Sequence, residues 1–379
     1  MEICPGWELL ASHPHWRPSM LCANISLVFK GWLAAMVKKQ QLWEYLARAI
    51  SFCIAVMFPT VGAQAQTSAE FYKGKTINVL IGVGVGGFYD LNARIVARHI
   101  GRHIPGGPNL VPQNMTGAGG ARMVAYLAEV APRDGSTLGM IPNNFPAMQA
   151  IGSEAIKFDL GRFQWIGSPA PLTGAMTVWR TSGIASIDDA RRKEVLTGAS
   201  GRGAESFSMP AMLNEFIGTR FKIVTGYPGG NEINLAMERG EVQARYNFWS
   251  SWKSTRPEWL KNGDIRVIAI MGPKAADLPD APSASDLAAT EDDRRVVELI
   301  ISGTYLGTPL AFGGGVPADR LEVMRAAFNA TMKDPEFLAE AEKLRIEVNP
   351  VSAADLKTVV SRVLKTPPAL AARARPILE

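Results

Sequence analysis

Three glycines near residue 85 have the spacing of a dinucleotide-binding fingerprint. Residues 81–90 read IGVGVGGFYD, so that Gly82, Gly84 and Gly87 match the pattern G-x-G-x-x-G between an apolar run and a helix-like segment. In that pattern a strand, a tight glycine turn and the start of a helix hold a pyrophosphate on bare backbone N–H groups. The spacing therefore indicates either a dinucleotide site or a site for some other anion.

The second strand argues against a dinucleotide. Such a site needs an acidic residue about 20 residues on, at the end of the next strand, to bind the ribose hydroxyls. The next strand is NLVPQNM, and no Asp or Glu occurs between Asp90 and Glu129. The glycines still suit an anion, because Gly86 and Gly87 allow close approach to N–H groups at a helix start. The alternative is a plain strand-to-helix turn capped by Asp90.

The same device recurs along the chain. SGRG (residues 200–203) and YPGGN (227–231) each end a predicted strand and open a helix, and PNN (142–144) closes another strand with side-chain amides. Ligands of open α/β sheets bind beyond the carboxyl ends of strands, so these loops could face one crevice. Arg202 would add a planar set of donors for a carboxylate.

These loops sit between short β-branched runs and amphipathic stretches, which alternate as in parallel βαβ units. Helices are predicted at about 89–104, 120–131, 205–217, 231–239, 317–332, 334–344 and 351–364. Strands are predicted at 76–83, 109–115, 136–141, 163–169, 176–180, 194–200, 221–227, 242–248, 265–270 and 305–312. We therefore expect an α/β fold with two lobes, crossed near residues 168–180 and 303–312.

The segment before residue 66 has the layout of a secretory signal. From Met36 it has a basic start, an apolar core from Ala49 to Phe58, a helix-breaking proline, and the small-x-small sequence that ends at Ala65. The core has about 10 residues, too few for a permanent membrane span, which needs roughly 20. We expect cleavage after Ala65 and export to the periplasm. Residues 1–35 are then an upstream extension, the alternative being a membrane anchor over residues 21–36.

Cysteine and charge exclude several classes of function. All three cysteines precede residue 66, which excludes disulfides and thiolate chemistry from the exported part. The whole chain has 40 Lys+Arg and 35 Asp+Glu, and the first 65 residues hold five and three of these, which leaves a net charge of +3. Because no basic run accompanies this small excess, we expect no nucleic-acid partner.

The sequence supports an enzymatic function less well than a binding function. His99 and His103 have helical i, i+4 spacing but no HExxH glutamate between them, so a metal site is not expected. Ser200 lies in GASGR, where a nucleophile elbow would need a glycine in place of Arg202. We predict neither catalysis nor a cofactor, with an exported hydrolase as the alternative.

The loops together resemble a family of binding proteins. GG-x-x-D at 86–90, QNMTGAGGARMVAYLAEVAPRDGSTLG from Gln113, TGASGRG from Thr197 and GYPGGNEINLAMERGEV from Gly226 are similar to the periplasmic receptors of tripartite tricarboxylate transporters, called TctC or Bug proteins. The resemblance covers about residue 70 to the end. It departs at Val83-Gly84-Val85, where proline is common, and at Glu205-Ser206-Phe207-Ser208, where Ser or Thr with His is common.

The resemblance implies a type II periplasmic binding protein, with two doubly wound lobes joined by two crossing segments. Lobe 1 would comprise residues 66–170 and 308–379, and lobe 2 residues 171–307. A small carboxylate would bind between them and pass to the membrane subunits of the transporter, with a sensor protein as an alternative recipient; we expect a monomer. The ligand-binding residues implied are Gly86, Gly87, Asp90, Asn143, Asn144, Ser200, Gly201, Arg202, Gly203, Gly229 and Gly230.

Overall fold

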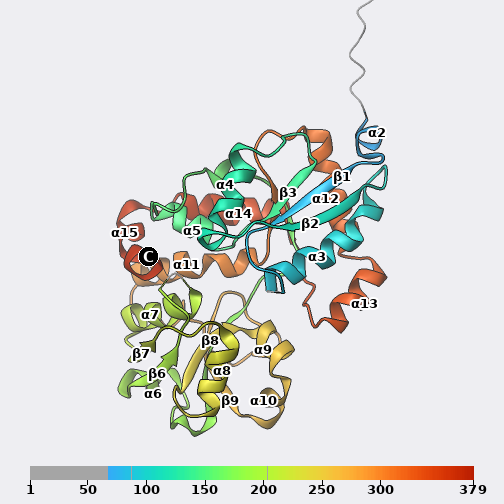
Figure 1. Ribbon diagram of the computed structural model, residues 1–379. Helices are drawn as coiled ribbons and strands as arrows, with labels where there is room; N and C mark the ends of the chain where they lie inside the picture. Colours follow the sequence, from blue (N-terminus) through green and yellow to red (C-terminus); the bar gives the residue numbers. More distant parts are fainter. Residues whose placement is uncertain (1–66, 87, 203) are drawn as a thin grey trace, which may run out of the picture. The chain divides into compact units, whose positions relative to one another are not determined.

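The computed structural model describes residues 67–86, 88–202 and 204–379 (Figure 1). These described residues belong to one compact unit. The predicted extension (1–35) and signal peptide (36–65) lie outside the described residues, as do Gly87 and Gly203. In the part that is described, no helix has the length and apolar character needed to cross a membrane.

A first sheet has the strand order β11-β4-β10-β3-β1-β2. β1 pairs in parallel with β2 and β3, whereas β10 runs antiparallel to β3 and β4. Ile81 at the end of β1 is opposite both Asn114 and Met140. The loops after the three parallel strands therefore emerge at one level. The bounds are β1 (Thr76–Ile81), β2 (Asn109–Asn114), β3 (Thr137–Met140), β4 (Gln164–Ser168), β10 (Leu310–Phe312) and β11 (Val351–Ser352).

Helices cover both faces of this sheet. Alternate residues of β1 point to opposite sides: Ile77, Val79 and Ile81 pack with α3, α12 and α13, while Leu80 packs with α4 and α14. These helices have sequence-encoded starts, such as Asp334, whose carboxylate accepts from the N–H groups of Glu336 and Phe337. The helices are α2 (Ser68–Tyr72), α3 (Phe88–Ile100), α4 (Ala121–Glu129), α5 (Phe145–Ala150), α12 (Ala318–Thr331), α13 (Pro335–Lys343) and α14 (Ala353–Leu364).

The second sheet has the order β7-β6-β8-β5-β9. β6 pairs in parallel with β7 and β8, and β5 is antiparallel to β8 and β9. Helix α7 lies on one face and α8 and α9 on the other, so this lobe is also doubly wound. The elements are β5 (Gly174–Trp179), β6 (Val195–Gly198), β7 (Phe221–Val224), β8 (Ala244–Phe248), β9 (Ile265–Met271), α6 (Ile187–Arg192), α7 (Glu205–Ile217), α8 (Gly230–Glu238), α9 (Trp249–Thr255) and α10 (Pro257–Asn262).

The chain passes from the first sheet to the second after β4, and it returns between β9 and β10 through helix α11 (Glu291–Leu306). The predicted strand at 305–312 is wrong over its first part, because Tyr305 and Leu306 end α11, and only β10 is extended. α11 packs against α5, α7, α14 and α15 (Pro368–Leu378). The lobe boundaries at residues 170 and 308 stay predictions, whereas the two-sheet α/β architecture itself is confirmed.

Candidate functional site

The first glycine loop is shaped by close backbone approach. A Cβ atom on Gly82 would lie 2.8 Å from the Cα of Gly120, so no larger residue fits without a backbone shift. Gly86 has a φ of +84°, a left-handed conformation that favours glycine. Its N–H donates to a carboxylate oxygen of Asp90 at 2.8 Å. The loop is therefore tied back onto the first turn of α3.

Asp90 holds this loop from inside the protein. The residue is 2% exposed, and its oxygens also accept from the Arg94 guanidinium and from the Asn114 amide, each at 2.9 Å. Burial alone would raise the pKa of Asp90, but these hydrogen bonds and that from Gly86 outweigh burial and lower the pKa. The structure thus gives Asp90 a loop-positioning role, and its predicted contact with a ligand stays a prediction.

The loop after β3 directs its two asparagines differently. The backbone N–H of Asn143 donates to the hydroxyl of Tyr89 at 3.1 Å. The side chain is 4% exposed, and its amide nitrogen has no hydrogen-bond partner among the described residues. Asn144 instead reaches Met148 of its own helix, with 3.4 Å from its amide nitrogen to the sulfur. The structure brings Asn143 toward α3 but does not bring Asn144 there.

The loop after β6 is open and lightly tethered. The backbone N–H of Ser200 donates to the Ser206 hydroxyl at 3.2 Å, and a Cβ on Gly201 would meet no atom within 4 Å. Arg202 is exposed, with its guanidinium 5.2 Å from the Phe207 ring centroid. Ala204 precedes α7 without a side-chain cap, so the first N–H groups of this helix have no intrahelical acceptor. Such N–H groups suit an anion.

The loop before α8 lies beside the preceding one, because the N–H of Tyr227 donates to the carbonyl of Ala199 at 3.4 Å. Gly229 is extended, with a φ of −170°. The carbonyl of Gly230 accepts from Arg245 at 2.9 Å. Burial, and next the charge of a neighbouring arginine, lower the pKa of Arg245 to about 10. Gly229 and Gly230 thus lie next to a half-buried cation.

Three side chains outside the predicted set, Tyr89, Glu205 and Tyr246, interact electrostatically with one another. Tyr89 of α3 donates to the carbonyl of Gly307 at 3.4 Å and accepts from Asn143. Burial first, and then the charge of Glu205, raise the pKa of Tyr89 and that of Tyr246. Burial raises the pKa of the half-buried Glu205 itself to about 7. Elements of both sheets therefore place Tyr89, Glu205 and Tyr246 within electrostatic reach of one another.

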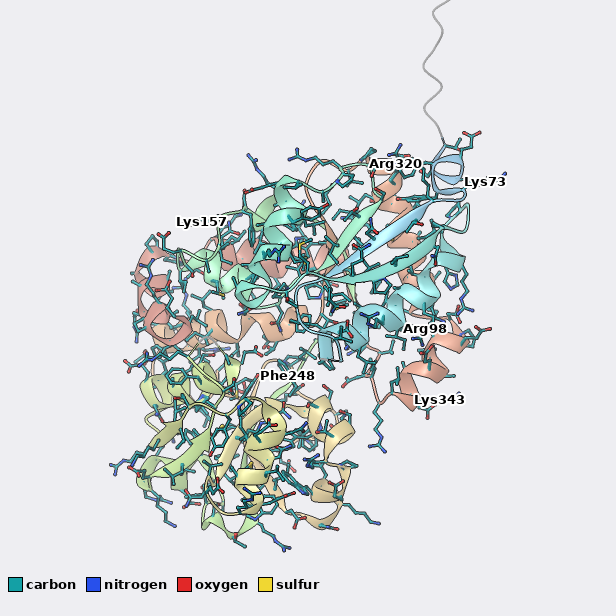
Figure 2. All side chains as sticks on the ribbon, in the orientation of Figure 1. Lys73, Arg98, Lys157, Phe248, Arg320 and Lys343 are labelled. Carbon is teal, nitrogen blue, oxygen red and sulfur yellow. The ribbon has the colours of Figure 1, made fainter. Side chains whose placement is uncertain are left out.

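Aromatic contacts reinforce this junction. The rings of Phe88 and Phe248 have centroids 6.3 Å apart, and Figure 2 labels Phe248 where elements of the two sheets meet. Phe248 also contacts Tyr246, at 5.9 Å between centroids. Phe88 and Tyr89 carry no sequence signal of such a role, and Glu205 stood out only as part of a departure from the family pattern. For Glu205 a signal was present, because an acidic residue follows a loop suited to an anion.

The remaining candidates have partners within the protein. The Nε2 atom of His99 lies 2.6 Å from a carboxylate oxygen of Glu340, and that of His103 lies 2.8 Å from a carboxylate oxygen of Asp334. These contacts join α3 and the turn that follows it to α13. Among the described residues, no group of three or more His, Cys, Asp or Glu side chains has the arrangement of a metal site.

No protein-family model and no curated protein sequence matches the chain. Solved structures do. A TctC solute-binding protein from Polaromonas, with no ligand, has a TM-score of 0.63 and 17% identity, covering 80% of this chain and 99% of that chain. R. palustris Rpa4515 with adipate has a TM-score of 0.58 and 18% identity, and the match covers 79% of this chain and 97% of that chain.

MatC (Rpa3494) from Rhodopseudomonas palustris with bound malate has a TM-score of 0.55 and 16% identity, covering 80% of this chain and 99% of that chain. At such identities the likeness concerns the fold, which extends over nearly the whole of each neighbour. The chain therefore has the fold of the TctC solute-binding proteins, the family that its loop sequences resemble.

Proposed function

We propose that this protein is an exported receptor that captures a small carboxylate between its two lobes and delivers it to the membrane subunits of a tripartite tricarboxylate transporter. One observation carries the proposal. Tyr89, which follows the first glycine loop, accepts a hydrogen bond from the Asn143 N–H, and among the described residues the Asn143 amide nitrogen and the Tyr246 hydroxyl are buried without hydrogen-bond partners. Buried polar groups of this kind are normally hydrogen-bonded, so a polar ligand would complete them.

Backbone amides would supply most of the attraction for the carboxylate. N–H groups at the starts of α3 and α7 carry partial positive charge and need no side-chain reorganisation. Contacts with both lobes favour a closed arrangement over an open one, so ligand binding and lobe movement are coupled. The adipate and malate in the neighbours Rpa4515 and MatC support a carboxylate as the ligand class.

The binding proposal is tested by a thermal-shift and calorimetry screen of the purified protein with mono-, di- and tricarboxylates. A ligand at 100 times its Kd adds about 2.7 kcal/mol to the free energy of unfolding, enough for a clear rise in Tm. Absence of any shift, together with hydrolysis of an ester or amide, would contradict the receptor function.

Export and delivery need separate tests. Expression in a host with a periplasm, followed by N-terminal sequencing of the secreted chain, should give Gln66 as the first residue. Cells lacking this protein should lose uptake of the ligand found in the screen. Unchanged uptake with intact binding would instead favour a receptor that serves a sensor protein.

A further inference from the structure

The helices α11, α14 and α15 border a groove away from the glycine loops, called here the α11–α14–α15 groove. α11 packs against both of the other helices, and Figure 1 shows the three together. The groove has a volume of about 330 Å³. Residues of α11, the end of α14 and the first turn of α15 line it, and none of them belongs to the candidate carboxylate site.

The floor of the groove is apolar. Leu299, Val363 and Leu370 line it and are 4%, 4% and 7% exposed. All three belong to one apolar core cluster, so packing of the core fixes the floor. A floor of this kind can receive a large apolar side chain of an occupant without ordering further side chains of the protein.

Three cations line the same groove without carboxylate partners. Arg295 of α11, Arg362 of α14 and Lys365 directly after α14 are exposed, and in the described part of the chain none of them is in a salt bridge. The carboxylate of the lining, Glu298, is paired with Arg294 instead, at 3.3 Å between Oε1 and Nε. By contrast, both arginines of α3 have carboxylate partners. The groove therefore has an excess of positive charge that neighbouring side chains do not balance.

This combination fits an acidic segment of a partner protein. Protein interfaces combine an apolar centre with a polar rim, and exposed charges on the rim steer association with a partner of opposite charge. An anionic bilayer is normally bound by a cluster of about four to eight Lys or Arg, and it is too flat to fill a hollow. The first 65 residues of this chain do not fit the groove either, because they hold five Lys+Arg and three Asp+Glu.

We propose that the α11–α14–α15 groove docks an acidic segment of a partner protein. A large apolar side chain of that segment lies on the floor, and its carboxylates pair with Arg295, Arg362 and Lys365. The groove and the candidate carboxylate site share no residue, so that the docking proposal and the receptor function can each fail alone.

The probe is a synthetic peptide of about 12 residues, made of Glu and Leu with one central Trp, of the kind that lies in a groove through spaced apolar anchors. Two matched peptides replace every Glu by Lys, or the Trp by Ala. Fluorescence anisotropy of the labelled peptides with the purified protein in about 50 mM NaCl measures the Kd. The acidic peptide should bind about tenfold more tightly than either matched peptide, and added salt should weaken it because the cations are exposed.

Reversal of the lining charges locates the binding. The double variant Arg362→Glu with Lys365→Glu should weaken binding of the acidic peptide by about tenfold or more, and Arg295→Glu, on a different helix, should weaken it in the same direction. Lys357→Glu is the matched control, because Lys357 is exposed on α14 and does not line the groove. It should keep the wild-type Kd. All four positions are exposed, so Tm values near that of wild type are expected throughout.

Three results would overturn the proposal. The first is equal binding of the acidic and basic peptides, or an equal loss of affinity in Lys357→Glu and in the double variant. The second is binding to vesicles of equal parts phosphatidylcholine and phosphatidylserine that the double variant loses, without binding of the peptide, which would assign the groove to a bilayer. The third is a dimer in sedimentation equilibrium that dissociates in the double variant, which would assign the groove to a second copy of the chain.

Discussion

Replacing Asp90 by Asn should destabilise the protein through the first glycine loop. One Asp90 oxygen accepts from Arg94 and Asn114, and the other accepts from Arg94 and the Gly86 N–H. An asparagine amide would turn one of these acceptors into a donor. Either orientation of the amide therefore sets N–H groups against N–H groups in a position that is 2% exposed.

The magnitude follows from these contacts. Breaking a buried ion pair costs about 3 to 5 kcal/mol, but the Arg94 side chain is 35% exposed and can regain water, so we expect the lower end, about 3 kcal/mol. At roughly 2 cal/mol/K per residue over roughly 300 residues, this corresponds to a fall in Tm of about 5 °C. Differential scanning calorimetry and urea unfolding near neutral pH measure both quantities.

The pH dependence gives an independent readout. Because the folded pKa of Asp90 is lowered, its contribution is present above the unfolded pKa of about 3.9 and is lost as the pH falls through the folded pKa. The difference between wild type and Asp90→Asn should therefore narrow in acid. Arg98→Gln, one turn further along α3, is the control, since Arg98 is 59% exposed and should cost under about 0.5 kcal/mol. Equal Tm values for wild type and Asp90→Asn would refute this account of the loop.

Three further predictions concern stability. Tyr89→Phe should lower the free energy of unfolding by about 1 to 2 kcal/mol, because it leaves the Asn143 N–H without its acceptor. Tyr246→Phe removes a hydroxyl that has no partner among the described residues, and it should be neutral or stabilising in urea unfolding. Gly307→Ala should lower the free energy of unfolding by well over about 2 kcal/mol, because at a φ of +69° its Cβ would overlap the Ala170 carbonyl. Gly183→Ala, at a φ of +72°, would meet no atom within 4 Å and should lower the free energy of unfolding by only about 1 kcal/mol. Similar losses of Tm in the two variants would contradict the steric argument. Glu205→Gln should stabilise the unliganded protein by about 2 kcal/mol at about pH 8. Because the pKa of Glu205 is raised in the folded protein, the wild type loses stability as the pH rises from the unfolded pKa to about 7, and the variant does not. A variant no more stable than wild type at that pH would contradict this.

Local patterns were enough to predict most elements and the fold class. Period-2 runs such as residues 76–81 and glycine loops before helices are short-range signals, and the structure has a strand or helix at each. Helix α11 was missed because its stretch VVELII is β-branched and apolar, which favours a strand locally. Burial against four helices overrides that preference.

The junction of the candidate site could not be predicted in the same way. Positions 89, 205 and 246 are far apart in sequence, and only the packing of the two sheets brings them together. The role of Asp90 likewise depends on its hydrogen bond with Asn114, which is 24 residues later in the chain and ends β2, the strand that pairs with β1. Glycine loops can be recognised from local composition, whereas the sequence has no local signal for side chains that face one another across two sheets.

The core around α11 makes the protein mechanically stiff on one side. Ala147 of α5 and Ala371 of α15 belong to the same apolar cluster as Met176 and Val178 of β5. Separating the sheets there would expose apolar surface at about 25 cal/mol per Å², whereas elsewhere α3 and β8 meet through the Phe88–Phe248 ring contact. We therefore expect the lobes to open about a hinge at α11, so that solutes enter and leave past these two rings.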